Sequence, residues 1–319
     1  MVINLVATIT SAILSVYYDK RFRICMKKLA VVDDTLEELG SPKIYQNMYT
    51  WSKRTVIAWI VYSNAYNFYD VIWWVNRKET ASWAFIISYL LNHPLHVNML
   101  MDLIFITILW YIGNRFDKIN EHMQHFLMNE HYGLRNRWKK PLIFHTYISS
   151  CTEKYKRVLW TLMHLHLELC RIARELNGMF GAQMAFEMAS YLFYLIELCY
   201  YLFGMLVKKQ QEEIIKSALI GISLWTFSFV ARLCTVNYIC ESVGVKANNI
   251  NKITHYLTNT SEYASVRKEI YQFTLQAIHS PLRFTGMGLF YFGNKFLQKF
   301  CLTIVTLVII MVQMSEIFF

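Results

Sequence analysis

Two glutamates, Glu187 and Glu197, lie inside one long apolar stretch, and a pair of carboxylates could act as general acid and base. Ten residues of helix would separate them by about 15 Å along the axis. That separation is too large for a shared catalytic site. A charge inside a membrane span is costly, by roughly 2.5–3.5 kcal/mol. We therefore expect each glutamate to face protein or water, with Arg232 of a neighbouring stretch as a candidate ion-pair partner for one of them.

Histidines and cysteines form no recognisable metal site. His164 and His166 are two residues apart, which points their rings to different faces of a helix. His122 and His125 share a face, but Glu121 is the only acidic neighbour in sequence. The seven cysteines contain no CxxC pair. No metal, cofactor or catalytic residue is expected, because phosphate loops, GxSxG elbows and HExxH helices are also missing from the sequence.

Amides, histidines and aromatic rings gather in two other apolar stretches. They are Asn64, Asn67, Asp70 and Trp73 in residues 55–75, and Asn92, His93 and His96 in residues 85–112. Polar groups in hydrocarbon face protein or a cavity. Together with Glu187, these side chains are candidates to line an outward-opening pocket for a small organic ligand. Hydrogen bonding between helices, beside an interfacial belt of aromatic rings, is the alternative.

The last apolar run, residues 296–315, carries one thin polar stripe. Thr306 and Gln313 are seven residues apart, about two helical turns, and Lys299 lies seven residues before Thr306. A pore-lining helix needs such a stripe, because one face meets water and ions while the rest meets protein and lipid. The same residues could instead hydrogen-bond to neighbouring helices. The pattern alone leaves both interpretations open.

The composition indicates that membrane helices position these residues. Of 319 residues, 55% are apolar and 17% are charged, whereas soluble domains have roughly 25% charged residues. The third apolar stretch is longer than one crossing and contains Pro94, so we expect one kinked or tilted helix there. Six stretches reach or approach the ~20 apolar residues that cross a bilayer. They are residues 1–18, 55–75, 85–112, 179–207, 217–239 and 296–315.

Lysine and arginine indicate the orientation of the spans. Segments 19–54, 113–178 and 240–288 contain 8, 11 and 5 of these residues, while 76–84 and 208–216 contain 2 and 3. Positive loops stay inside, so the three long segments are predicted to be cytosolic and both chain ends external. The net charge of +10 then faces anionic lipid rather than nucleic acid. We predict a single all-α domain over residues 1–319, a six-span bundle with cytosolic helical extensions.

Three cytosolic stretches show helical spacing. Residues 23–40 end at Gly40, which predicts a helix stop, and residues 153–177 run unbroken toward the fourth span. Residues 261–280 are amphipathic. Their buried face is expected to contain Val266, Ile270, Phe273 and Ile278.

The ending "TLVIIMVQM" (306–314) resembles the terminal signature of insect gustatory receptors, Thr-Tyr followed by five apolar residues and then Gln-Phe. Thr306 and Gln313 match the signature. Leu307 stands where Tyr is usual, and Met314 stands where Phe is usual. Three upstream stretches are similar to other patches of that family and occur in the same order: "GNRFDKINEHM" (113–123), "ELCRIARELNGMFG" (168–181) and "HSPLRFTGMGLFYFGNKFLQKF" (279–300).

The resemblance implies seven spans, so residues 1–18 would correspond to the second span and the first has no counterpart in this sequence. It implies a tastant-gated cation channel of four like or unlike subunits, in the plasma membrane of gustatory neurons. The last helix would line the pore, with Gln313 and Met314 near the outer constriction, Thr306 deeper, and Leu307 and Ile310 between them. A bitter or other aversive compound is the starting expectation for the ligand.

Three alternatives remain at this point. An odorant receptor of the same superfamily would share the fold, although the ending favours the gustatory side. A secondary transporter would show repeated halves or paired interrupted helices, and neither is evident. A G-protein-coupled receptor would have a cytosolic C-terminus, whereas the charges predict an external one.

Overall fold

The computed structural model describes residues 2–42, 45–76, 80–137, 145–207, 212–259 and 267–318. Within these residues it contains long helices and one short β-hairpin, which confirms the predicted all-helical bundle. In chain order the elements are α1 (Val2–Glu38), α2 (Tyr45–Val75), α3 (Ala81–Arg137), α4 (His145–Val207), α5 (Glu212–Asn248), α6 (Ile250–Asn259), α7 (Arg267–His279), β1 (Thr285–Gly286), β2 (Phe290–Tyr291) and α8 (Asn294–Phe318).

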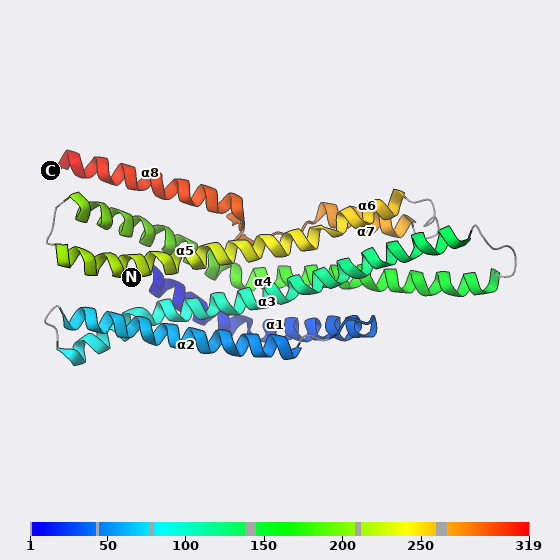
Figure 1. Ribbon diagram of the computed structural model, residues 1–319, viewed down its shortest axis with the longest axis horizontal. Coiled ribbons are helices and arrows are strands. Elements are labelled where there is room, and N and C mark those ends of the chain that lie inside the picture. The colour runs from blue at the N-terminus through cyan, green and yellow to red at the C-terminus, as the bar shows by residue number, and fades with distance from the viewer. Residues whose placement is uncertain are drawn as a thin grey trace.

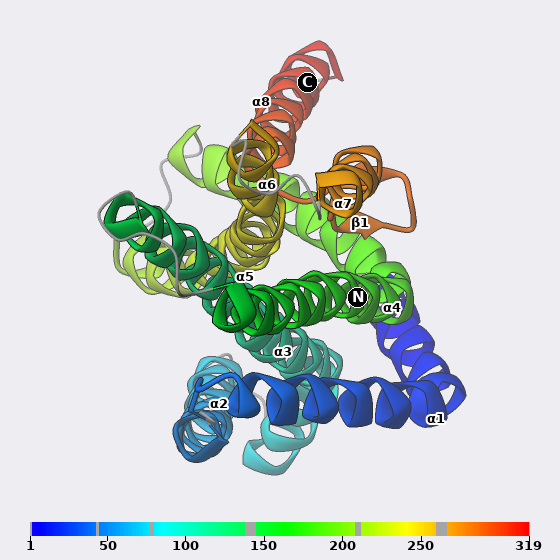
Figure 2. The same ribbon diagram turned by 90° about the vertical axis from the view of Figure 1, so that its right-hand side faces the viewer.

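The long helices run roughly along one direction and alternate in sense. The C-terminal ends of α2, α4 and α8 lie at one end of the molecule, while those of α1 and α3 point toward the other (Figure 1). The helix α8 lies along one edge of the bundle, and α1 and α2 lie on the opposite side (Figures 1 and 2). Such alternation is required of a chain that crosses a membrane repeatedly, and which end faces the cytosol stays a prediction.

By length and composition, three helices of the described part are apolar enough to cross a membrane. These segments are Ala81–His125, Leu219–His255 and Asn294–Met314, which cover all or nearly all of the third, fifth and sixth predicted spans. The other three predicted spans lie in α1, α2 and α4. The number of six spans therefore stays a prediction.

Several local predictions agree with the structure. The stretch around Pro94 is one helix of 57 residues, and the stretch from 153 to 177 lies inside the 63-residue α4. The end of α1 is a glycine cap. Gly40 has φ of 93°, its N–H donates to the Glu37 carbonyl at 2.9 Å, and the Ser41 N–H donates to Leu36 at 2.9 Å. This left-handed conformation suits glycine, which has no Cβ to clash.

Buried side chains are concentrated in the half predicted to be cytosolic. Examples are Leu29 and Leu36 of α1, Phe116 and Ile119 of α3, Leu162 and Leu169 of α4, Ile253 of α6 and Ile270 of α7. In the other half, large apolar side chains such as Val16, Phe68, Leu90, Phe227 and Leu302 are exposed. Exposed apolar surface on this scale is unfavourable in water and typical of helices that face lipid.

The predicted buried face of α7 is partly wrong. Ile270 and Phe273 are buried as predicted, but Ile278 is exposed and Ala277 is buried instead. Position 277 lies almost two full turns after Ile270, whereas position 278 is turned a further 100° away. Val266 lies outside the described residues.

His166 is an uncharged part of the cytosolic core. Its Nε2 lies 2.9 Å from the Ala247 carbonyl and donates to it, and its ring packs against Phe116 and Phe273 with centroids 5.4 and 5.5 Å away. Burial lowers the pKa of His166 to about 4. His164, two residues earlier, is exposed, so the two rings do point to different faces.

This burial predicts a loss of stability in acid. An unfolded chain would protonate His166 near pH 6.5, while the folded chain resists until about pH 4. The stability that depends on neutral His166 is therefore fully present above pH 6.5 and decreases as the pH falls toward 4. At pH 5 the free energy of unfolding is lower by about 2 kcal/mol. The melting temperature of the purified protein should fall between pH 7.5 and pH 5. His166→Gln, which keeps an N–H donor but cannot titrate, should show a smaller fall, and an equal fall would refute the assignment.

The hairpin and the start of α8 are fixed by side chains of α4 and α5. Asn177 of α4 holds β1: its Oδ1 accepts the Thr285 N–H at 2.9 Å, and its Nδ2 donates to Thr285 Oγ1 at 3.2 Å. On α5, Asn237 Oδ1 accepts the Gly293 N–H at 2.9 Å, and Glu241 Oε2 accepts the N–H of residue 294 at 2.8 Å. A carboxylate at a helix N-terminus is favourable, so α5 fixes the point where α8 begins.

Candidate functional site

Four of the polar residues predicted in the second and third spans form one cluster between α2 and α3. Asn92 Nδ2 donates to Asn67 Oδ1 at 3.1 Å and to Asp70 Oδ2 at 2.6 Å. His96 Nε2 lies 3.1 Å from the same Asn67 oxygen and donates to it. Asn67 and Asn92 are buried. The cluster provides the hydrogen bonding between helices that the alternative interpretation predicts, and it fixes the ring of His96.

A small cavity lies beside this cluster, between α2, α3 and α5. Its volume is about 20 Å³, which is room for about one water molecule. His96 belongs to both the cluster and the cavity wall. The other lining residues are Tyr62, Tyr66, Leu95, Met99, Trp225, Ser228, Phe229 and Arg232.

Aromatic rings form most of the cavity wall. Tyr66 packs edge-on against Trp225 with ring centroids 4.6 Å apart, and Trp225 stacks on Phe229 at 5.6 Å. Tyr62 Oη donates to Ser228 Oγ at 2.9 Å, which joins α2 to α5. Aromatic walls with a few polar groups are typical of sites for small organic ligands. Sequence reasoning missed the contribution of α5, because no polar cluster in that stretch pointed to it.

Next to the cavity, Arg232 of α5 is held by buried carboxylates from two helices. Its Nε and Nη2 donate to Asp102 Oδ2 of α3 at 2.9 and 2.6 Å, and Nη2 lies 3.9 Å from Glu187 Oε2 of α4. Tyr191 Oη donates to Asp102 at 3.1 Å, and Gln183 Nε2 donates to Glu187 Oε1 at 3.0 Å. The network joins three helices inside the segments predicted to span the membrane.

This network completes the expected pairing of Arg232. Sequence reasoning proposed Glu187 or Glu197 as its partner. Glu187 is within ion-pair distance, but Asp102 is closer, and Glu197 is exposed. The missed signal was Asp102 itself, a single acid inside the apolar stretch 85–112.

Other predicted pocket residues lie away from the cavity. Asn64 is exposed and accepts a hydrogen bond from Tyr89 Oη at 3.2 Å. His93 is exposed, and Trp73 packs edge-on against Trp74 with centroids 5.2 Å apart. Glu187 is buried in the ion network and does not line the cavity. Among the described residues, no three His, Cys, Asp or Glu side chains are grouped so that they could hold a metal ion.

The predicted pore residues lie on a helix that has little contact with the rest of the chain. Only 6% of the apolar window of α8 is buried. The exposed residues include Thr306, Ile310, Gln313 and Met314, while Leu307 is half-buried. The helix packs on α4 and α5 with a face that contains Ile304, about 160° around the axis from Thr306. The polar stripe therefore points away from the body of the subunit.

Comparison with known families matches residues 1–318 to the 7tm chemosensory receptor family. The chain belongs to this family. It is therefore a multi-pass membrane protein and a chemosensory receptor rather than an enzyme. The resemblance seen in the ending and in the three upstream stretches is confirmed at the level of the family.

Two relatives illustrate the match. The chain is 21% identical over 168 residues to putative gustatory receptor 28b of Drosophila melanogaster, which is 52% of this chain and 36% of that relative. The match thus spans about a third of the relative's length. In structure, the chain is similar to the insect olfactory receptor OR5 from Machilis hrabei, with a TM-score of 0.65 and 13% identity over 98% of this chain and 80% of that one. This similarity confirms the fold of the receptor.

Proposed function

We propose that the chain is a gustatory receptor subunit that forms a tastant-gated cation channel in the plasma membrane of taste neurons. Four copies, identical or mixed, would surround one pore lined by α8. The observation that carries this proposal is the exposed stripe of Thr306 and Gln313 on a helix that is otherwise apolar and hardly buried. An amide facing hydrocarbon is unfavourable, so this stripe is expected to meet water or a neighbouring subunit.

The gustatory assignment has two supports. The ending "TLVIIMVQM" resembles the signature of gustatory receptors, and the partial sequence match is to a putative gustatory receptor. The proposed assembly of subunits is supported by the shape of the single chain, because α8 lies at the edge of the bundle (Figure 2). The side chains of its polar stripe, Thr306 and Gln313, are exposed. Met314 would give an apolar gate that is more flexible than phenylalanine.

The proposed tastant site is the cavity between α2, α3 and α5. Its volume of about 20 Å³ is far below the roughly 300–1,000 Å³ of ordinary ligand pockets. Binding therefore requires that the three helices separate, and a tastant that prefers the opened form would increase its population. His96 and the amides of Asn67 and Asn92 would then offer polar contacts beside the aromatic wall.

Gln313→Ala tests the pore assignment. If the stripe lines the pore, removing the amide should change the basal current or the Ca²⁺ to Na⁺ permeability ratio by at least about twofold, because channel-lining groups set ion selectivity at close range. The measurement is whole-cell current in cells that express the chain with tastant-responsive gustatory receptor subunits. Surface labelling would show that the variant still reaches the membrane.

Val305→Ala is the matched control. Val305 is 55% exposed on the same helix, but it lies about 100° around the axis from Thr306. It should leave permeability unchanged. Equal currents in wild type and Gln313→Ala, with normal surface labelling, would contradict a pore role for the stripe.

A further inference from the structure

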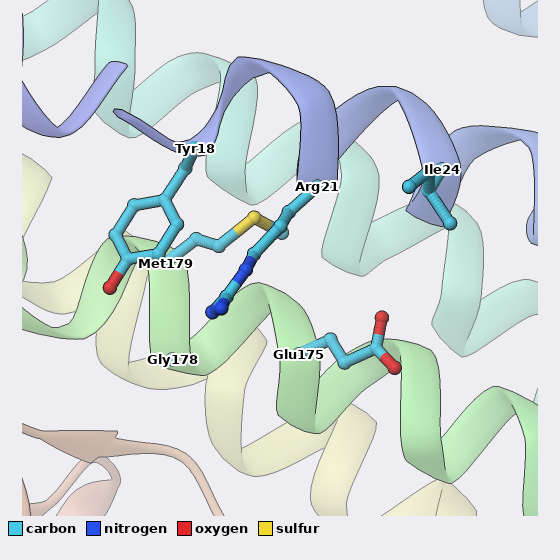
Figure 3. Close-up of a pocket in the computed structure, with 6 residues that line it drawn as sticks. All are labelled: Tyr18, Arg21, Ile24, Glu175, Gly178 and Met179. Carbon is cyan, nitrogen blue, oxygen red and sulfur yellow. The ribbon is translucent and has the colours of Figure 1, made fainter. Parts of the chain in front are cut away.

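A groove lies between α1 and α4, on a side of the molecule that the cavity and the pore helix do not use. Its volume is about 410 Å³. Among the residues that the structure describes, its lining includes Tyr18, Arg21 and Ile24 from α1, and Glu175, Gly178 and Met179 from α4. Figure 3 shows the Arg21 side chain extending from α1 across the groove toward α4, between Tyr18 and Glu175.

The groove lies at the predicted cytosolic edge of the hydrocarbon. Tyr18 is the last residue of the first predicted span, and Met179 is the first residue of the fourth. The predicted cytosolic ends of these two spans belong to antiparallel helices, α1 and α4. Tyr18 and Met179 nevertheless line the same groove, so the two predicted ends lie at one level. A ligand there would have its polar part at the level of the lipid headgroups.

One cationic side chain of the groove, Arg21, is not neutralised by a nearby carboxylate in the described part of the chain. Glu175 is paired with Lys28 Nζ at 2.9 Å and with Arg171 Nε at 3.4 Å, and Arg23 is paired with Asp19 at 2.9 Å. Arg21 has no carboxylate within ion-pair distance among the residues that the structure describes. Its guanidinium lies 5.8 Å from the centre of the Tyr18 ring. The groove therefore presents a free, planar cation.

Apolar side chains flank this cation along α1, with Ile13 and Tyr17 toward the membrane interior and Ile24 on the cytosolic side. Ile13, Tyr17, Arg21 and Ile24 follow one another at intervals of four, four and three residues, which places them on one stripe of α1. Ile13, Tyr17 and Ile24 are 63%, 66% and 45% exposed. On the facing helix, a Cβ added at Gly178 would have no atom within 4 Å. The groove is thus open where a headgroup would lie and is bordered by apolar surface where an acyl chain would lie.

We propose that this groove binds an anionic phospholipid of the cytosolic leaflet. Arg21 donates N–H hydrogen bonds to oxygens of the anionic headgroup, because its fork of donors matches both carboxylate and phosphate oxygens. One acyl chain lies along Ile13 and Tyr17. Basic pockets between helices at the cytosolic side are suited to anionic headgroups, which are concentrated in that leaflet. The site does not depend on whether the chain conducts ions, so it can be tested by binding alone.

The test is native mass spectrometry of the full chain in detergent, with phosphatidylserine or phosphatidylcholine added in equal amounts. The wild type should retain phosphatidylserine at least about fivefold better than phosphatidylcholine. Arg21→Ala should remove that preference, and Arg21→Lys should keep part of it. Arg23→Ala is the matched control, because it deletes the same charge two residues away, where Asp19 already pairs with it. This variant should bind like the wild type.

Gly178→Leu tests the groove without changing any charge. A leucine side chain would occupy the open floor, and leucine favours helix more than glycine does, so the fold is expected to persist while lipid binding falls. Millimolar inorganic phosphate should not displace the lipid, because it lacks the acyl chains. The proposal is overturned if phosphatidylcholine binds equally well, if Arg23→Ala loses as much as Arg21→Ala, if Gly178→Leu binds normally, or if phosphate alone competes.

Discussion

Replacing Arg232 with methionine is expected to destabilise the folded receptor by about 3–5 kcal/mol, because it leaves two buried acids without their cation. Asp102 and Glu187 are 2% and 1% exposed, and Arg232 Nη2 lies 2.6 and 3.9 Å from them. Methionine fills similar volume, so the loss would come from charge rather than from a cavity. The measurement is the temperature at which a fluorescently tagged receptor in detergent loses its monodisperse peak on size exclusion.

Two further variants make this result specific. Arg283→Met removes an exposed arginine that lies over the Tyr291 ring at 5.5 Å, and it should shift the transition little. Arg232→Met combined with Asp102→Asn removes one of the two acids and should recover part of the lost stability. A single Arg232 variant that melts like the wild type would show that the network does not hold α3, α4 and α5 together.

Asp33→Asn is expected to have a comparable effect in the cytosolic half, again about 3–5 kcal/mol. Asp33 of α1 and Arg115 of α3 form an ion pair of 2.6 Å in which both side chains are only 1% exposed. Tyr111 Oη donates to the other oxygen of Asp33 and accepts from Arg115 Nη2 at 2.8 Å. Asparagine keeps the shape and the acceptor for Tyr111, but it leaves the guanidinium buried without a counter-charge.

Hydrogen exchange can locate this effect. Amides in the cytosolic part of α1, around residues 25–38, should exchange faster in Asp33→Asn, because the ion pair fixes that segment to α3. Asp34→Asn makes the same charge change at an exposed neighbour and should cost at most about 1 kcal/mol. A double-mutant cycle with Arg115→Met would give the coupling of the pair. A coupling near zero would mean that packing alone holds α1 in place.

The helices could be predicted from the sequence because their signals are local. Apolar periodicity gives the long helices, and Gly40 gives the end of α1, since both depend on residues within a few turns. Lysine and arginine counts predict which ends of the helices are cytosolic, and this orientation stays a prediction. The face of α7 was wrong by one position, because a short amphipathic pattern does not distinguish Ala277 from Ile278 when a bulky residue is assumed to be the buried one.

The candidate site could be predicted only in part, because its walls come from helices that are far apart in sequence. Asn67, Asp70, Asn92 and His96 were predicted because polar residues in an apolar stretch are visible individually. Trp225 and Phe229 were not, since an aromatic residue in an apolar span has no local feature that separates a cavity wall from lipid contact. Asp102 and Arg232 are 130 residues apart, so their pairing is a property of the fold.

The way α5 meets α8 has a mechanical consequence. The uninterrupted helix α5 carries Trp225 and Arg232 at the cavity. Farther along, its Asn237 and Glu241 accept hydrogen bonds from the backbone N–H groups of residues 293 and 294. From Trp225 to Glu241 is about 24 Å of stiff rod. A tilt of α5 at the cavity would therefore move the start of α8 directly, because the two side chains connect the helices without a flexible loop between them. In the proposed receptor, ligand binding at the cavity and movement of the pore helix would then be coupled through one rigid helix, α5.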